Sequence, residues 1–188
     1  PVLIFEIEPG RANFGQAYDL ANFLSSPALN GATTVAWIPK TITGHAVLVA
    51  MACDEIVMSP HAVLGPVDPQ LGNFPAASIL RVVEQKPVAD VDDETLVLAD
   101  QAAKALRQLE GLVTELTTGT YPEDIVRRLS KVLTQGTWTH DYPIPCSEAA
   151  ALGLRVSTDM PQEVLDLMTY FPQPVRRVPS VEVGQEPL

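Results

Sequence analysis

The segment that decides the fold is residues 41–58, with the sequence TITGHAVLVAMACDEIVM. Between His45 and Cys53 no side chain is charged or strongly polar, and the segment closes with an acidic pair and a short apolar run. A helix on the protein surface would show a polar face, so we expect a helix here that is buried on nearly all sides. The helix is too short to cross a bilayer, which takes about 20 apolar residues.

We expect a strand immediately upstream, at residues 33–38, because the run TTVAWI is typical of buried parallel strands. Another short strand follows the helix at Ile56–Met58. The turn that precedes the helix therefore lies between the carboxyl end of a strand and the amino end of a helix. Open α/β folds place their binding and catalytic groups at such turns, because free backbone N–H groups converge there.

Composition restricts the class of protein. The chain has 188 residues, of which 46% are hydrophobic, and this predicts one domain over residues 1–188 with a substantial core. The net charge of −11 argues against a nucleic-acid partner, since phosphate backbones are bound by basic surfaces. Cys53 and Cys146 are not at metal-ligand spacing and there are only three histidines, so we expect reduced structural thiols and no metal or other cofactor.

The chain opens directly on an expected strand at residues 2–7, and neither a signal peptide nor a transmembrane run is visible. Membrane attachment through a preceding segment is compatible with this start. The sequence leaves a cytoplasmic and a membrane-associated location open.

Apolar periodicity predicts the remaining elements. A helix at 15–24 joins the strands at 2–7 and 33–38 into a right-handed strand–helix–strand unit. The longest helix runs from Glu94 to about Leu116 and is capped by Asp92 or Asp93. Its side chains expected in the core are Leu96, Ala103, Leu106 and Val113. Further helices are expected at 76–85, 121–133, 147–152 and 161–170, followed by an extended tail over 172–188.

Six motifs occur in order over roughly seven tenths of the chain, a combination more specific than any single motif. They are DEIVM (54–58), AVLGPVDPQLG (62–72), PAASIL (75–80), LAD (98–100), WTHDYP (138–143) and PSVE (179–182). Together they resemble the serine dehydrogenase proteinase family, distant relatives of the ClpP, signal-peptide-peptidase and NfeD serine peptidases. The resemblance implies an α/β fold, a ClpP/crotonase-like spiral of βαβ units with a helical carboxyl-terminal portion. It also implies a peptidase ancestry with serine, aspartate and histidine in that chain order.

The resemblance also implies the site residues. Asp68 matches the family's orienting acid and His140 its base, while Gly10, in the turn after the first strand, matches an oxyanion-hole position. The family's nucleophilic serine precedes the aspartate of the DEI motif by ten residues and is followed by two glycines. In this chain that position is Gly44, followed by His45, so the expected nucleophile is missing. Arg11 likewise replaces the second glycine of the oxyanion turn.

Simpler explanations exist for several of these residues. The role of Asp68 could be limited to capping a proline-rich turn. His140 could be a loop residue that forms local hydrogen bonds beside Asp141. Thr41 or Thr43 could substitute as the nucleophile, but a threonine before a helix is ordinarily a cap. His45 could act as a base, as a polar contact or only fill space.

Lys86 and Lys104 could correspond to the Ser–Lys dyad of related peptidases. Without a serine to activate, however, each is expected to be a solvated surface lysine.

Two functions from different classes therefore remain open. The first is a ClpP-fold serine peptidase homologue, a hydrolase of peptide bonds by ancestry. The second is a catalytically silent module that binds extended peptides or forms an oligomeric scaffold. Both imply a peptide or protein partner and a homo-oligomer. A crotonase-like thioester enzyme is a weaker third alternative, because no coenzyme A contact pattern is present.

Overall fold

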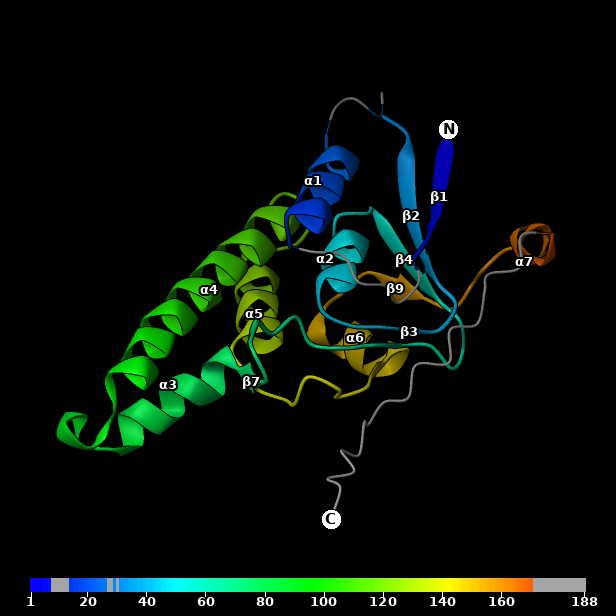
Figure 1. Cartoon of the computed structure of the whole chain (residues 1–188). Coiled ribbons are helices and arrows are strands. Elements are labelled where there is room, and N and C mark those ends of the chain that lie inside the picture. The colour runs from blue at the N-terminus through cyan, green and yellow to red at the C-terminus, as the bar shows by residue number, and fades with distance from the viewer. Residues whose placement is uncertain (8–13, 27–28, 30, 171–188) are drawn as a thin grey trace, which may run out of the picture.

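The computed structural model describes residues 1–7, 14–26, 29 and 31–170. Its centre is a four-stranded, all-parallel sheet with the strand order β1-β2-β4-β9 (Figure 1). These strands are β1 (Val2–Glu6), β2 (Thr33–Ile38), β4 (Glu55–Met58) and β9 (Val156–Ser157). The predicted parallel pairing of the first three strands is confirmed.

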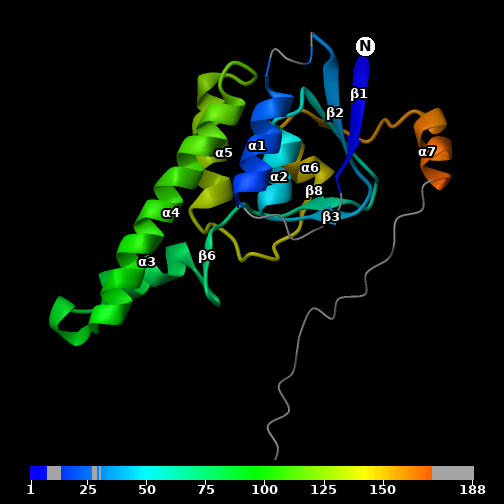
Figure 2. The ribbon, with the colours of Figure 1, turned by 45° about the horizontal axis from the view of Figure 1, so that its top comes forward.

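Two helices pack on one face of this sheet, α1 (Phe14–Leu24) and α2 (His45–Met51) (Figures 1 and 2). Every residue from Val47 to Cys53 is buried, as the apolar sequence predicts. Helix α2 therefore forms the centre of the main hydrophobic core, together with side chains of β2 and β4 such as Ile38 and Ile56.

A second, smaller sheet joins β3 (Thr41–Ile42) in parallel to β5 (Val63–Leu64), and β5 in antiparallel to β8 (Ile144–Pro145). A separate hairpin pairs β6 (Gln70–Leu71) with β7 (Phe74–Pro75). These short strands bring three distant segments together: the turn before α2, the proline-rich segment after β5, and the loop that precedes β8.

Helices α3 (Ala76–Gln85) and α4 (Asp93–Thr117) form a hairpin that extends away from the sheets (Figures 1 and 2). A short 3-10 helix, η2 (Val88–Asp90), lies between them. The side chain of Asp92 accepts a hydrogen bond from the N–H of Thr95, so Asp92 is the cap of the two predicted candidates, Asp92 and Asp93. The outer part of the hairpin has a small hydrophobic cluster of its own, formed by Ala76, Ile79, Ala99 and Ala102.

The chain returns through α5 (Glu123–Thr134), which packs against α4, and α6 (Cys146–Leu152), and ends its described part with α7 (Gln162–Thr169). Among the described residues, no helix combines the length and the apolar composition that crossing a membrane requires. The predicted tail at 172–188 lies outside the described residues.

The predicted burial was wrong at several helix positions. Val113 is buried, but Leu96, Ala103 and Leu106 are only half-buried. The apolar period of a helix shows which side chains share a face, but it does not show whether another element covers the whole length of that face. The outer half of α4 packs against α3 in a small cluster apart from the main core, so its apolar stripe stays partly accessible.

Candidate functional site

The turn that leads into α2 has an unusual backbone at Gly44. Its φ is 59° and its ψ is −131°, a conformation that only glycine adopts without strain. The N–H of Gly44 donates to the carbonyl oxygen of Pro66 at 3.2 Å, and its own carbonyl oxygen accepts from the N–H of Val47. The first helical turn of α2 and the proline-rich segment therefore hold this sharp turn in place from both sides.

The proline-rich segment at 65–69 is fixed between this turn and α5. The N–H of Gly65 donates to the carbonyl oxygen of Ile42 at 2.7 Å, and that of Val67 donates to Leu133 at 2.9 Å. A Cβ atom at Gly65 would lie 2.5 Å from Cγ2 of Thr43, so only glycine allows the two segments to approach this closely. These contacts place Asp68 beside the turn, with 2% of its side chain exposed.

His140 belongs to the loop at 135–143, which joins α5 to β8. The rings of Trp138 and Tyr142 stack at 4.9 Å between centroids, and the N–H of Tyr142 donates to the carbonyl oxygen of Thr139. The Tyr142 hydroxyl donates to the carboxylate of Glu148. Partial desolvation and the Glu148 charge raise the pKa of the Tyr142 phenol, which keeps it a donor. His140 therefore lies on a loop whose two flanks are held together.

Asp68 and His140 form a direct pair. Nδ1 of His140 lies 2.6 Å from Oδ1 of Asp68, and the His140 side chain is 40% exposed. Gln70 donates from Nε2 to Oδ2, the other oxygen of the same carboxylate. A carboxylate acceptor favours a proton on Nδ1, which leaves the lone pair of Nε2 free to accept a proton. The pair therefore has the arrangement of an oriented general base.

Gly44 lies directly in front of this pair. A Cβ atom at Gly44 would lie 3.9 Å from Cε1 of His140, a ring carbon bonded to both ring nitrogens. A side chain at position 44 would therefore extend beside the imidazole ring, where a nucleophile lies next to its base in acyl transfer. The structure thus brings together three of the four predicted site residues. The fourth, Gly10, lies outside the described residues.

These residues line a cavity of about 550 Å³. Its apolar walls come from Val67, Leu71, Ala105 and Leu109, and its polar ones from Thr43, His45, Gln70 and Gln108. One wall is a stretch of α4, so a helix that begins outside the main core completes the cavity. A cavity of this size with mixed lining suits a ligand of a few residues rather than a single ion.

Neither cysteine is placed to act as a nucleophile in this cavity. Burial raises the pKa of the Cys53 thiol to about 12, so this thiol is protonated at neutral pH and is a poor nucleophile. Cys146, at the start of α6, is not among the lining residues. Among the described residues, no group of three or more histidine, cysteine, aspartate or glutamate side chains is arranged to hold a metal ion.

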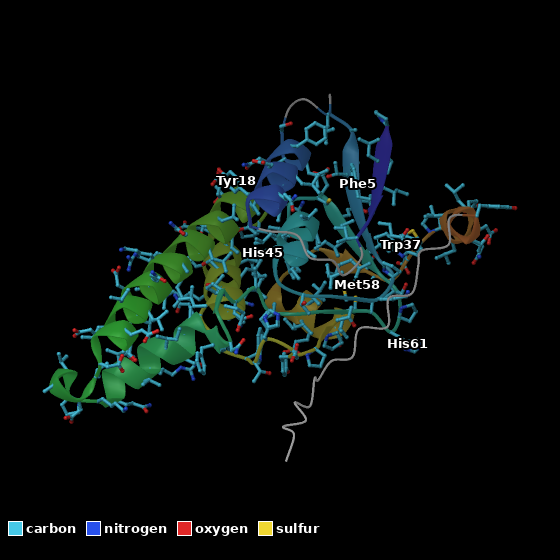
Figure 3. All side chains as sticks on the ribbon, in the orientation of Figure 1. Phe5, Tyr18, Trp37, His45, Met58 and His61 are labelled. Carbon is cyan, nitrogen blue, oxygen red and sulfur yellow. The ribbon has the colours of Figure 1, made fainter. Side chains whose placement is uncertain are left out.

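The other predicted candidates have different surroundings. Thr43 lines the cavity, but its methyl group packs on Gly65. Thr41 is exposed in β3, and Lys104 forms an exposed ion pair with Asp100 one turn away on α4. Lys86 is exposed at the carboxyl end of α3. His45 begins α2 (Figure 3). It is also one of the residues that line the cavity.

Two features of the site were missed from the sequence. Gln70 is part of a quoted motif, yet nothing in the motif indicated that its amide contacts Asp68. The wall formed by Ala105, Gln108 and Leu109 was missed because these residues belong to an ordinary amphipathic helix. Only the spacing of three and four residues, which places them on one face, could have suggested that they act together.

Comparison with known proteins gives the family. The chain is 48% and 45% identical to two uncharacterized proteins of Methanocaldococcus jannaschii, over 151 and 150 residues respectively. Each match covers 80% of this chain but only 53% and 51% of the relative, so the chain spans about half the length of these relatives. No solved structure gives a significant match. The profile of the ClpP-like SDH-type serine proteinases matches residues 16–188, and the chain therefore belongs to this family.

Proposed function

We propose that this chain is a catalytically silent member of its family, which binds a peptide segment in the Gly44–His140 cavity without cleaving it. One observation carries the proposal. Gly44 occupies the place in front of the Asp68–His140 pair where a nucleophile is needed, and glycine has no atom that can be acylated.

Membership of this family supports a peptide or protein as the ligand. Serine proteinases of this type act on peptides or proteins, and the cavity offers apolar surface together with amides that pair with a peptide backbone. Gln70 and Gln108 are among the lining residues, and a side-chain amide can pair with backbone N–H and C=O groups of a ligand.

The alternative within the same family is an active peptidase that uses Thr43. The close packing of the Thr43 methyl group on Gly65 supports a structural role instead, because it ties the turn to the proline-rich segment. An attack by Thr43 would require its hydroxyl to turn toward His140 without losing this contact.

A fluorophosphonate probe tests the proposal directly, since it labels activated serine and threonine hydroxyls. The unmodified chain should not be labelled. The double variant Gly44→Ser/His45→Gly should be labelled, because it supplies the hydroxyl and removes the imidazole that would crowd it. Adding His140→Ala should abolish this labelling, as expected if the hydroxyl is activated by the base.

Two results would contradict the proposal. Labelling of the unmodified chain that disappears in Thr43→Val would identify Thr43 as the nucleophile. Labelling of the double variant that is insensitive to His140→Ala would show that Asp68 and His140 do not activate position 44.

Ligand binding is tested separately, with a fluorescent peptide library on the unmodified chain. Ala105→Phe should block the cavity and reduce binding, because Ala105 lines it. Ala150→Phe, at an exposed position of α6, introduces the same ring elsewhere and should leave binding unchanged. Equal binding by both variants would place the peptide outside the cavity.

We also propose that the chain self-associates through the α3–α4 hairpin. The support is an apolar groove of about 240 Å³ lined by Phe74, Ser78, Ile79, Val82, Thr95 and Leu98. Phe74 and Val82 are 63% and 45% exposed, which leaves apolar surface unburied in one copy of the chain. Light scattering measures the molar mass in solution of the unmodified chain and of Val82→Glu, in which a carboxylate replaces an apolar side chain of the groove. A monomer in both cases would refute self-association.

A further inference from the structure

We propose that Gln70 is the positioning residue of this site: its amide holds the Asp68 carboxylate in the orientation that presents His140 to the cavity. The proposal rests on the roles proposed above for Asp68 and His140. It assigns a role to a residue that the family comparison and the sequence motifs left without one.

The first argument is the pairing of the carboxylate. Oδ1 of Asp68 is bonded to Nδ1 of His140, and Oδ2 accepts from Nε2 of Gln70. With only 2% of the Asp68 side chain exposed, water has little access, so each oxygen depends on a protein donor. Loss of the Gln70 donor would leave Oδ2 buried and unpaired, and the carboxylate would be free to turn away from His140.

The second argument is that Gln70 is itself held in place. Gln70 pairs with Pro75 and Leu71 with Phe74 in the β6–β7 hairpin. The N–H of Ala76 donates to the carbonyl oxygen of Pro69 at 2.9 Å, which ties the start of the hairpin to the start of α3. The Gln70 amide that contacts Asp68 therefore belongs to the β6–β7 hairpin, which is held by hydrogen bonds, and not to an open loop.

The third argument is the direction of the bond. A glutamine amide has one donor end and one acceptor end, and only the NH₂ end is attracted to a carboxylate. A donor on Oδ2 and the histidine on Oδ1 fix the plane of the carboxylate, and this plane directs the His140 ring. Nδ1–H then points to Asp68, and the Nε2 lone pair is left for a group at position 44.

The test uses Gln70→Met, which keeps the length of the side chain but removes the donor. Gln101→Met, at an exposed position of α4, is the matched control for the same chemical change. In the otherwise unmodified chain, NMR of a ¹⁵N-histidine-labelled sample should show a slowly exchanging, strongly downfield Nδ1 proton for His140. This signal should be lost in Gln70→Met and kept in Gln101→Met.

A second measurement follows the rate of fluorophosphonate labelling in the Gly44→Ser/His45→Gly variant. Gln70→Met should lower the labelling rate by about 10- to 100-fold, the effect of losing a hydrogen bond to a charged group. Gln70→Glu adds a pH test, because a protonated glutamic acid donates to Asp68 whereas a glutamate repels it. The labelling rate of Gln70→Glu, divided by that of the parent at each pH, should rise as the pH is lowered.

The outcomes separate the two proposals. An unchanged Nδ1 signal in Gln70→Met overturns the role of Gln70, whatever the labelling shows. A pH-independent ratio for Gln70→Glu also overturns it, because a purely structural defect would not depend on the protonation of the new side chain. Absence of labelling even with Gln70 intact would refute the proposed roles at position 44, while the NMR comparison would still decide the role of Gln70.

Discussion

The two halves of the candidate site differ in the groups that they contain. On one side, Asp68 and His140 are paired at 2.6 Å, and Gln70 donates to the second carboxylate oxygen. On the other side, Gly44 has a sharply bent backbone that faces the pair, but no side chain. The comparison shows that the backbone geometry of the turn at position 44 does not depend on a side chain at that position.

The reason lies in the bonds that hold each half. The turn at Gly44 is held by backbone hydrogen bonds to Pro66 and Val47, and neither bond depends on the side chain at position 44. The contacts of the acid–base half all involve side chains, those of Asp68, His140 and Gln70. A substitution at position 44 therefore leaves the bonds that hold the turn in place, whereas a substitution at Asp68 removes the acceptor of both His140 and Gln70.

The largest effect is expected for Asp68→Asn in the Gly44→Ser/His45→Gly background. Asparagine offers its NH₂ group as well as its oxygen, so it no longer selects the Nδ1–H form of His140. Fluorophosphonate labelling should fall by roughly 10²–10⁴-fold, as for loss of an oriented base. A fall of less than tenfold would mean that another group orients His140.

The next largest is a loss of stability in Gly65→Ala. The new Cβ would lie 2.5 Å from Cγ2 and 3.2 Å from Cα of Thr43, so the backbone must move. We expect a decrease of about 3 kcal/mol in the free energy of unfolding, the upper part of the range for overpacking. Chemical denaturation measures it, and Gly111→Ala, with no atom within 4 Å in helix α4, should instead stabilise the protein by about 0.5–1 kcal/mol.

Gly44→Ala should be less severe, because no atom lies closer than 3.9 Å to the new Cβ. Only the backbone conformation opposes alanine, at a cost of about 1–3 kcal/mol. Thermal and chemical denaturation should show this loss while the His140 NMR signals stay in place. A large shift of those signals would contradict the separation of the two halves.

The smallest effect is expected outside both halves, for Leu106→Ala in α4. Truncation of a fully packed core leucine lowers the free energy of unfolding by about 2–5 kcal/mol. Leu106 is only half-buried, so we expect a decrease of about 1 kcal/mol. Leu109→Ala, three residues along the same helix and 4% exposed, should reach the full range. Equal losses for the two variants would indicate that Leu106 is covered in solution, for example by a second copy of the chain.

Most of the fold followed from the sequence, because each element has a strong local signal. The apolar segment after Gly44 predicted buried α2, and the bounds expected for α3 are those observed. The pairing of Asp68 with His140 was expected only through the family resemblance, since 72 residues separate them in the chain. The contact of Gln70 with Asp68 had no signal, because a glutamine amide finds its partner through tertiary geometry that a motif does not encode.

The separate cluster in the outer α3–α4 hairpin has a consequence for how ligands reach the cavity. Ala99 and Ala102 of α4 belong to that small cluster, whereas Leu109 and Leu112 belong to the main core, and the cavity wall lies at the junction. Small clusters open more often than large ones, so amides in the outer half of α4 should exchange with solvent before those near Leu112. Such partial unfolding would move one wall of the cavity while the sheet and the Asp68–His140 pair stay folded. The proposed peptide ligand could then enter without any movement of Asp68 or His140.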